Sequence, residues 1–159
     1  MKRRSLLKLG VGAGVLLAVA GGGLALLRPG LVDDKLSPGA RTLMRAVARA
    51  VLDGLLPNDE PGREAALDAQ LARLDASIAG FPAAVREELS QVLALLGLRH
   101  DWAEAPTAEV QAMLERLRLS TLDTRQQIYR ALRDLQCVSF FSDPASWPLA
   151  GYPGPRAMP

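Results

Sequence analysis

The pair His100-Asp101 is the first candidate for chemistry in this 159-residue sequence, because an imidazole beside a carboxylate can relay a proton. His100 is the single histidine of the chain, and the pair lies in the stretch LRHDWAEAP. General acid–base catalysis also needs a pocket and a reacting partner, and two adjacent residues predict neither. The pattern favours a surface loop with Trp102 packed onto the protein over a catalytic site.

The residues for a nucleophilic or metal site are few. Cys137 is the single cysteine, so it cannot form an internal disulfide, and one histidine cannot build a metal site alone. Cys137 lies between Leu135 and Val138, which favours a buried thiol. An intermolecular disulfide or a reactive thiol is the alternative. The sequence contains no Cys-x-x-Cys-His for haem and no Gly-x-Gly-x-x-Gly after a strand. We therefore expect no catalytic residue, no metal and no cofactor in this chain.

Three arginines recur at every fourth position near the start of the expected helical region: Arg41, Arg45 and Arg49. On a helix this spacing places them along one face. Such a stripe can dock on an acidic partner or on lipid headgroups. The alternative is an ordinary solvated face opposite Leu43 and Val47.

The basic charge of the chain is concentrated at its start. The formal net charge is +2, yet four of the nineteen basic residues lie within the first eight positions, and no acidic residue precedes Asp33. Without residues 1–20 the chain has fifteen basic and seventeen acidic residues, a net charge of −2. No basic stripe of the kind that neutralises phosphates is then left, so we expect no nucleic-acid binding.

Residues 1–27 have the order of an export signal: a basic start, an apolar region and small residues for cleavage. Arg3 and Arg4 are followed by Leu6, Leu7 and Lys8, which resembles the twin-arginine motif R-R-x-F-L-K. Glycines lower the hydrophobicity of the apolar region, which favours the twin-arginine (Tat) route for folded proteins. The expected location is the periplasm, or the periplasmic face of the inner membrane, of a bacterium.

This leader has two alternative fates. Ala18 and Ala20 form an A-x-A cleavage site, after which the leader is removed. The nineteen residues from Leu9 to Leu27 approach the roughly 20 that cross a bilayer, so the alternative is an uncleaved N-terminal anchor in the membrane.

Helical patterns cover residues 38–141, after a segment 28–37 whose Pro, Gly and Asp content predicts a linker. Ser37-Pro38 predicts the start of a helix over about 38–56, and the turn PNDEPG follows it. Four more helices are predicted: one around 67–78, one from Pro82 to about Gly97, one from Thr107, and one with a capping box at Thr124. The predicted fold class is all-α, a small bundle of about five helices.

Residues 142–159 form a separate C-terminal tail by composition. This segment holds five of the eleven prolines, and residues 140–159 hold four of the seven aromatic residues. Proline removes an amide donor and fixes φ, so we expect an extended tail. Disordered tails are poor in aromatic residues, so either the protein's own helices or a partner should cover these four. They are Phe140, Phe141, Trp147 and Tyr152.

Two motifs point to one family. Leu55–Gly62, within LLPNDEPG, matches an I-L-P-x-D-x-x-P-G pattern, and FFSDP with GYPG lies at Phe140–Pro144 and Gly151–Gly154. With the twin-arginine leader and the helical body, these motifs resemble the gluconate 2-dehydrogenase subunit 3 family. Its members are the small, or gamma, subunits of membrane-associated FAD-dependent dehydrogenases.

The resemblance implies a non-catalytic escort subunit. In that family the large subunit is a flavoprotein of the glucose–methanol–choline (GMC) type, which takes up FAD in the cytoplasm and is exported bound to the small subunit. The implied partners are this flavoprotein, the Tat translocase and, in many members, a cytochrome c subunit. The alternative is a stand-alone helical periplasmic protein, tethered by an uncleaved N-terminal segment. The residues expected to contact the flavoprotein are Pro57, Pro61, Gly62, Phe140, Phe141, Trp147, Tyr152 and Pro153.

Overall fold

A computed structural model of the chain describes residues 29–98 and 101–155, and it confirms the all-α class. The described part contains five α-helices, one 3₁₀-helix and two strands of two residues each. In chain order they are β1 (Leu31–Val32), β2 (Lys35–Leu36), α2 (Pro38–Val51), α3 (Glu60–Ala79), α4 (Ala83–Gly97), α5 (Thr107–Arg118), α6 (Asp123–Phe141) and η2 (Pro144–Ala150).

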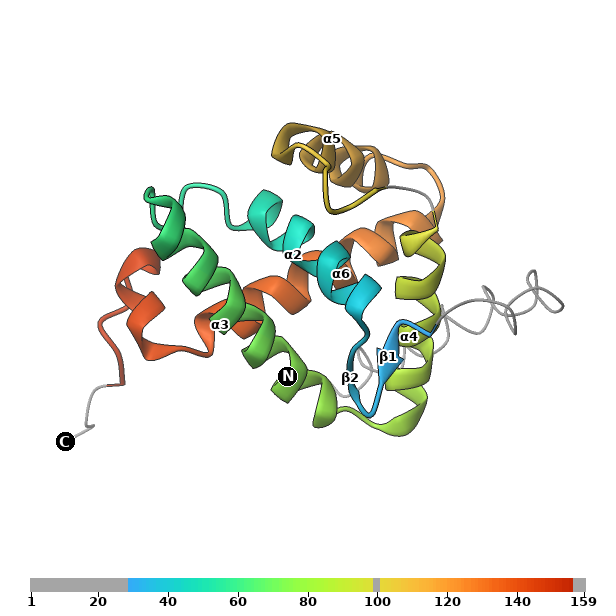
Figure 1. Cartoon of the computed structure of the whole chain (residues 1–159), viewed down its shortest axis with the longest axis horizontal. Coiled ribbons are helices and arrows are strands. Elements are labelled where there is room, and N and C mark those ends of the chain that lie inside the picture. Colours follow the sequence, from blue (N-terminus) through green and yellow to red (C-terminus); the bar gives the residue numbers. More distant parts are fainter. Residues whose placement is uncertain (1–28, 99–100, 156–159) are drawn as a thin grey trace, which may run out of the picture.

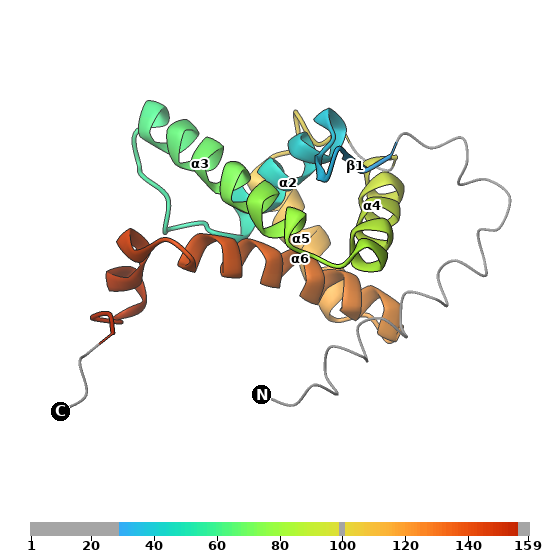
Figure 2. The same cartoon turned by 90° about the horizontal axis from the view of Figure 1, so that it is seen from below.

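Helix α2 is the centre of the bundle. It contacts each of the other four helices, which lie around it in Figures 1 and 2. The sequence of α2 explains this position, because large apolar side chains alternate with alanines that let neighbouring helices approach closely. Its buried residues are Ala40, Leu43, Met44, Ala46, Val47, Ala48 and Ala50.

Helix α3 buries one apolar face in the core. Leu67, Leu71, Leu74 and Ile78 are all fully buried, as their spacing predicts. Burying one such side chain contributes about 1.5–3 kcal/mol relative to leaving it in water. This face, packed against α2 and α6, therefore contributes a large share of the stability of the bundle.

The start of α2 is predicted correctly, whereas the start of α6 is not. The Ser37 hydroxyl accepts from the Ala40 N–H at 3.3 Å, and Pro38 is the first residue of α2. Helix α6 begins at Asp123, one residue before the expected cap, and no side chain of the described residues caps its first turn. Thr124 therefore lies inside the helix, where it cannot adopt the non-helical backbone of a capping residue.

Residues 29–37 form a docked hairpin, so the prediction of a linker is wrong for this stretch. Strands β1 and β2 pair antiparallel through a two-residue turn, in which Asp33 and Asp34 have φ angles of 50° and 61°. The Leu36 N–H donates to Asp75 Oδ1 on α3 at 2.9 Å, and the Leu31 N–H donates to Ser90 Oγ on α4 at 3.0 Å.

The same hairpin is fixed by a close approach of backbones. A Cβ at Gly30 would lie 2.4 Å from the Ser90 carbonyl oxygen and 2.6 Å from the Leu93 Cβ, so this position requires glycine. The chain therefore enters the bundle beside α4 at a defined place, far from η2 along the longest axis of the molecule (Figure 1).

The tail expected to be extended is helical over Pro144–Ala150, so that prediction is wrong for these residues. Asp143 accepts from the Ala145 N–H at 3.0 Å, and Pro144 takes the first helical position, where its missing N–H costs no hydrogen bond. Gly151 ends the helix with a φ of 70°. The resulting helix η2 lies against the C-terminal end of α6 (Figure 2).

Candidate functional site

The two motifs that carry the family resemblance lie at the same end of the molecule. The α2–α3 turn (residues 52–59) and η2 are both at this end in Figures 1 and 2. Leu55 and Leu56 of the first motif and Phe140 and Phe141 of the second belong to a second hydrophobic cluster beside the main core. Its buried members are Ala48, Leu52, Leu67 and Phe140, and Val51, Leu55, Leu56 and Phe141 pack against them. The resemblance therefore corresponds to one structural unit, which we call the η2 end.

The α2–α3 turn is held in place by its own residues. Asp59 caps α3 by accepting from the Gly62 N–H at 2.7 Å, and Arg63 Nε donates to the Pro57 carbonyl at 3.1 Å. A Cβ at Gly62 would lie 2.5 Å from the Asp59 carboxylate, so glycine leaves room for the cap. Pro61 lies in the first turn of α3, where proline is tolerated. These residues have structural roles, and Pro57 and Pro61 are exposed.

The two phenylalanines of the FFSDP motif differ in their surroundings. Phe140 is only 8% exposed and belongs to the second cluster, so its ring packs inside this protein. Phe141 is half-buried and meets Phe140 edge to face, with ring centroids 5.2 Å apart. Phe141 is therefore open to a partner on one side, whereas Phe140 is not.

Trp147 organises the tail through contacts within a few residues. Its indole Nε1–H donates to the Phe141 carbonyl at 2.8 Å, and its ring lies 5.3 Å from that of Tyr152. The Tyr152 N–H donates to the Trp147 carbonyl at 3.0 Å, and the Ser146 hydroxyl donates to the Phe140 carbonyl at 2.9 Å. The segment is therefore folded without help from a partner.

Even so, this segment and the end of α6 leave several large apolar side chains exposed to solvent. Tyr152 is 48% exposed, Leu149 is 56% exposed, and Val138, one helical turn before Phe141, is 66% exposed. We define Val138, Phe141, Trp147, Leu149 and Tyr152 as the η2 surface, with the exposed Pro153 at its edge. Sequence reasoning indicates Leu149 as a surface anchor of the tail but misses Val138, because a single apolar residue on a helix gives no sign of the direction it faces.

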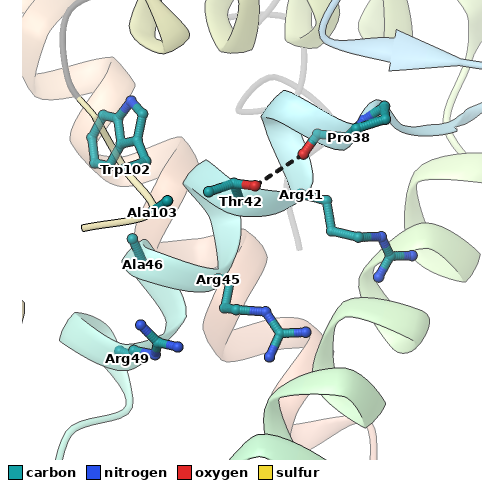
Figure 3. A pocket seen from close by; sticks show the side chains of 8 residues that line it. All are labelled: Pro38, Arg41, Thr42, Arg45, Ala46, Arg49, Trp102 and Ala103. Atoms are coloured by element: carbon teal, nitrogen blue, oxygen red, sulfur yellow. Dashed lines mark hydrogen bonds between the residues drawn. The ribbon is translucent and has the colours of Figure 1, made fainter. Parts of the chain in front are cut away.

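The arginine stripe on α2 faces α3 and is paired there. Arg41 bonds to Asp75, Arg49 to Glu64 at 3.0 Å, and Arg45 to Glu64 at 2.7 Å and to Asp68. Figure 3 shows the side chains of Arg41 and Arg45 directed toward α3. These ion pairs connect α2 to α3. The stripe is therefore neither a solvated face nor a surface free to bind an acidic partner or lipid headgroups, which were the two alternatives expected from the sequence.

A cavity of about 340 Å³ opens beside the same arginines, between α2 and the segment that holds Trp102 (Figure 3). It is lined by Pro38, Arg41, Thr42, Arg45, Ala46, Arg49, Trp102 and Ala103. The three arginine charges are balanced by Glu64, Asp68 and Asp75. The cavity therefore offers no surplus charge with which to hold an anion.

Only part of the loop before α5 is described. His100 lies outside the described residues, and Asp101 is exposed. Trp102 is packed onto the protein as predicted, at 5% exposure, and its Nε1–H donates to the Leu96 carbonyl at 3.1 Å. No group of three or more potential metal ligands occurs within residues 29–98 and 101–155.

Cys137 lies half-buried on α6, one residue before Val138. Burial raises the pKa of its thiol, because removal from water disfavours the thiolate. The thiolate is the nucleophilic form of cysteine. The thiol is thus only partly buried, and the burial expected from Leu135 and Val138 is incomplete because Val138 itself is exposed.

The residues assigned to export lie outside the described residues: Arg3, Arg4, Leu6, Leu7, Lys8, Ala18 and Ala20. Within the described part, none of the helices has the length and apolar character needed to cross a membrane. The export signal and the N-terminal anchor therefore stay predictions from the sequence.

Comparison with known proteins gave no match of any kind. No protein-family model matches the chain, no curated protein matches it, and no solved structure matches it.

Proposed function

We propose that this protein is the non-catalytic small subunit of a FAD-dependent dehydrogenase of the GMC type. It binds the folded flavoprotein, carries it through the Tat pathway and stabilises it on the periplasmic side of the inner membrane. The observation that carries the proposal is the η2 surface. Aromatic residues are enriched at protein interfaces, and Phe141, Trp147 and Tyr152 all keep exposed area on this surface.

The proposal assigns separate tasks to separate parts of the chain. Arg3 and Arg4 provide the Tat signal. The η2 surface holds the flavoprotein, whose FAD supplies the redox chemistry, and a cytochrome c subunit accepts the electrons. The position of the hairpin supports this division. Residues 29–37, which follow the leader in the sequence, are fixed beside α4 and lie far from the η2 end (Figure 1).

The test is export of the flavoprotein from cells that produce both subunits. With Arg3→Lys and Arg4→Lys together, we expect the flavoprotein and its bound flavin to stay in the cytoplasm. The matched control is Arg116→Lys with Arg118→Lys, which makes the same two changes on the exposed surface of α5. Normal amounts of flavoprotein in the periplasm of the leader variant would refute the escort function.

A second candidate is the stand-alone periplasmic protein tethered by its N-terminus. It is favoured by the internal contacts of the tail, since Phe140 is buried and the Trp147 indole is bonded within the chain. It predicts a stable monomer that binds no flavoprotein when residues 1–28 are removed. The deletion must stop at residue 28, because Leu31 and Leu36 bond to α4 and α3. Sedimentation of this fragment with and without the flavoprotein separates the two candidates.

A further inference from the structure

Arg73 on α3 joins three parts of the η2 end. Its Nε donates to the Ser139 carbonyl on α6 at 3.2 Å, and its Nη1 donates to Asp143 Oδ2 at 3.1 Å. Its Nη2 lies 3.4 Å from Gln70 Oε1 on its own helix. The planar guanidinium suits this arrangement, because its donors point in fixed, divergent directions. Asp143 is the cap of η2, so one side chain links α3, α6 and the start of η2.

The same arginine is continuous with a buried polar network in the core. Gln70 and Gln136 are fully buried, and the Gln70 amide donates to Gln136 Oε1 at 2.9 Å. The Gln136 amide in turn donates to the Met44 carbonyl on α2 at 2.9 Å. Buried polar groups favour a single arrangement of their neighbours, because other arrangements leave them without partners. The network therefore fixes the position of α6 relative to α2 and α3, and Arg73 extends it to η2.

The other hydrogen bonds of η2 stay close in sequence. Ser146 and Trp147 bond to the carbonyls of Phe140 and Phe141 at the end of α6. Among the described residues, Arg73 is the one residue outside both α6 and the segment itself that hydrogen-bonds to Asp143–Tyr152. Without Arg73, the hydrogen bonds that connect η2 to the rest of the described residues would all run to the end of α6.

We infer that Arg73 is a positioning residue for the η2 surface: through Asp143 it holds Trp147, Leu149 and Tyr152 in the orientation that the partner recognises. The part of this inference that concerns binding rests on the proposed function. An interface whose anchors are already ordered loses less entropy on binding, so a loosened η2 should bind more weakly although none of its contact residues has changed.

The first test needs no partner and follows hydrogen exchange of the two tryptophan indole protons by NMR. In Arg73→Met we expect protection of the Trp147 Nε1–H to fall about tenfold, the effect of losing one charge-assisted hydrogen bond. The Trp102 Nε1–H, bonded to the Leu96 carbonyl, is an internal reference that should not change. Arg86→Met is the matched control, because Arg86 has a similar exposure and is paired with Asp34, far from η2.

A second variant excludes simple unfolding as the cause. Asp143→Asn keeps a side chain that caps η2 well but removes its charge, so it should reproduce the faster exchange at Trp147. Arg73→Lys, which keeps the charge without the fork of donors, should fall between wild type and Arg73→Met. Unchanged protection of Trp147 in Arg73→Met, or equal loss at both tryptophans, would overturn the inference.

The second test measures binding of the GMC-type flavoprotein to the full chain. We expect Arg73→Met and Asp143→Asn to bind about tenfold more weakly than wild type and Arg86→Met. If wild type binds and exchange at Trp147 is faster in both variants, but their affinity is unchanged, the positioning role is wrong. If exchange is faster and wild type itself does not bind, the proposed function fails while the link between Arg73 and η2 stands.

Discussion

The main core and the η2 end are held together by different kinds of contact. The core around α2 joins residues from all five described α-helices, and its largest side chains are fully buried. The η2 end is organised by bonds that span at most a few residues, together with one small cluster and Arg73. The core can therefore determine the fold, whereas the side chains of the η2 surface are free to serve binding.

The largest effect should come from the core. Leu71→Ala removes a fully buried side chain from α3, and we expect it to lower the free energy of unfolding by about 2–5 kcal/mol. Leu149→Ala removes the same atoms from the η2 surface and should cost less than about 0.5 kcal/mol. Urea denaturation followed by circular dichroism measures both. Similar losses for the two variants would remove the distinction between the regions.

An intermediate effect should come from the polar network that connects the two regions. Gln136→Ala removes a side-chain acceptor from the buried Gln70 amide and a side-chain donor from the Met44 carbonyl, and we expect a loss of about 1–3 kcal/mol. The same denaturation experiment measures it. The control is Gln126→Ala, which removes a hydrogen bond from a partly buried glutamine to the Ser120 carbonyl. An equal loss in both variants would show that the network has no special importance.

The sequence is most informative where local signals and apolar spacing agree. Leu67, Leu71, Leu74 and Ile78 predict the buried face of α3, and Ser37-Pro38 predicts the start of α2. The same kind of signal, a capping side chain followed by proline, is present at Asp143-Pro144 and begins η2. The density of prolines in the tail predicts an extended chain, but this local signal at its start predicts a helix.

Other features depend on contacts that the sequence does not reveal. The hairpin turn uses two aspartates with left-handed φ angles, where glycine or asparagine is the usual signal. Arg73 hydrogen-bonds to Ser139 and Asp143, which follow it by 66 and 70 residues in the sequence, and no local pattern predicts these contacts. The spacing of Arg41, Arg45 and Arg49 predicts a stripe on one face of α2. It does not predict their acidic partners, which lie on another helix. In each case the missing information is the packing of one element on another.

The measurement that tests the central claim most directly is the affinity of the GMC-type flavoprotein for a chain with Trp147→Ala and Tyr152→Ala. The control is Leu119→Ala with Leu122→Ala, which removes two exposed apolar side chains near the α5–α6 connection. We predict binding at least about tenfold weaker than for the control, with helical content and cooperative unfolding retained. Unchanged affinity would contradict the assignment of the η2 surface to partner binding. Loss of the fold would instead assign both aromatic side chains to this protein's own core.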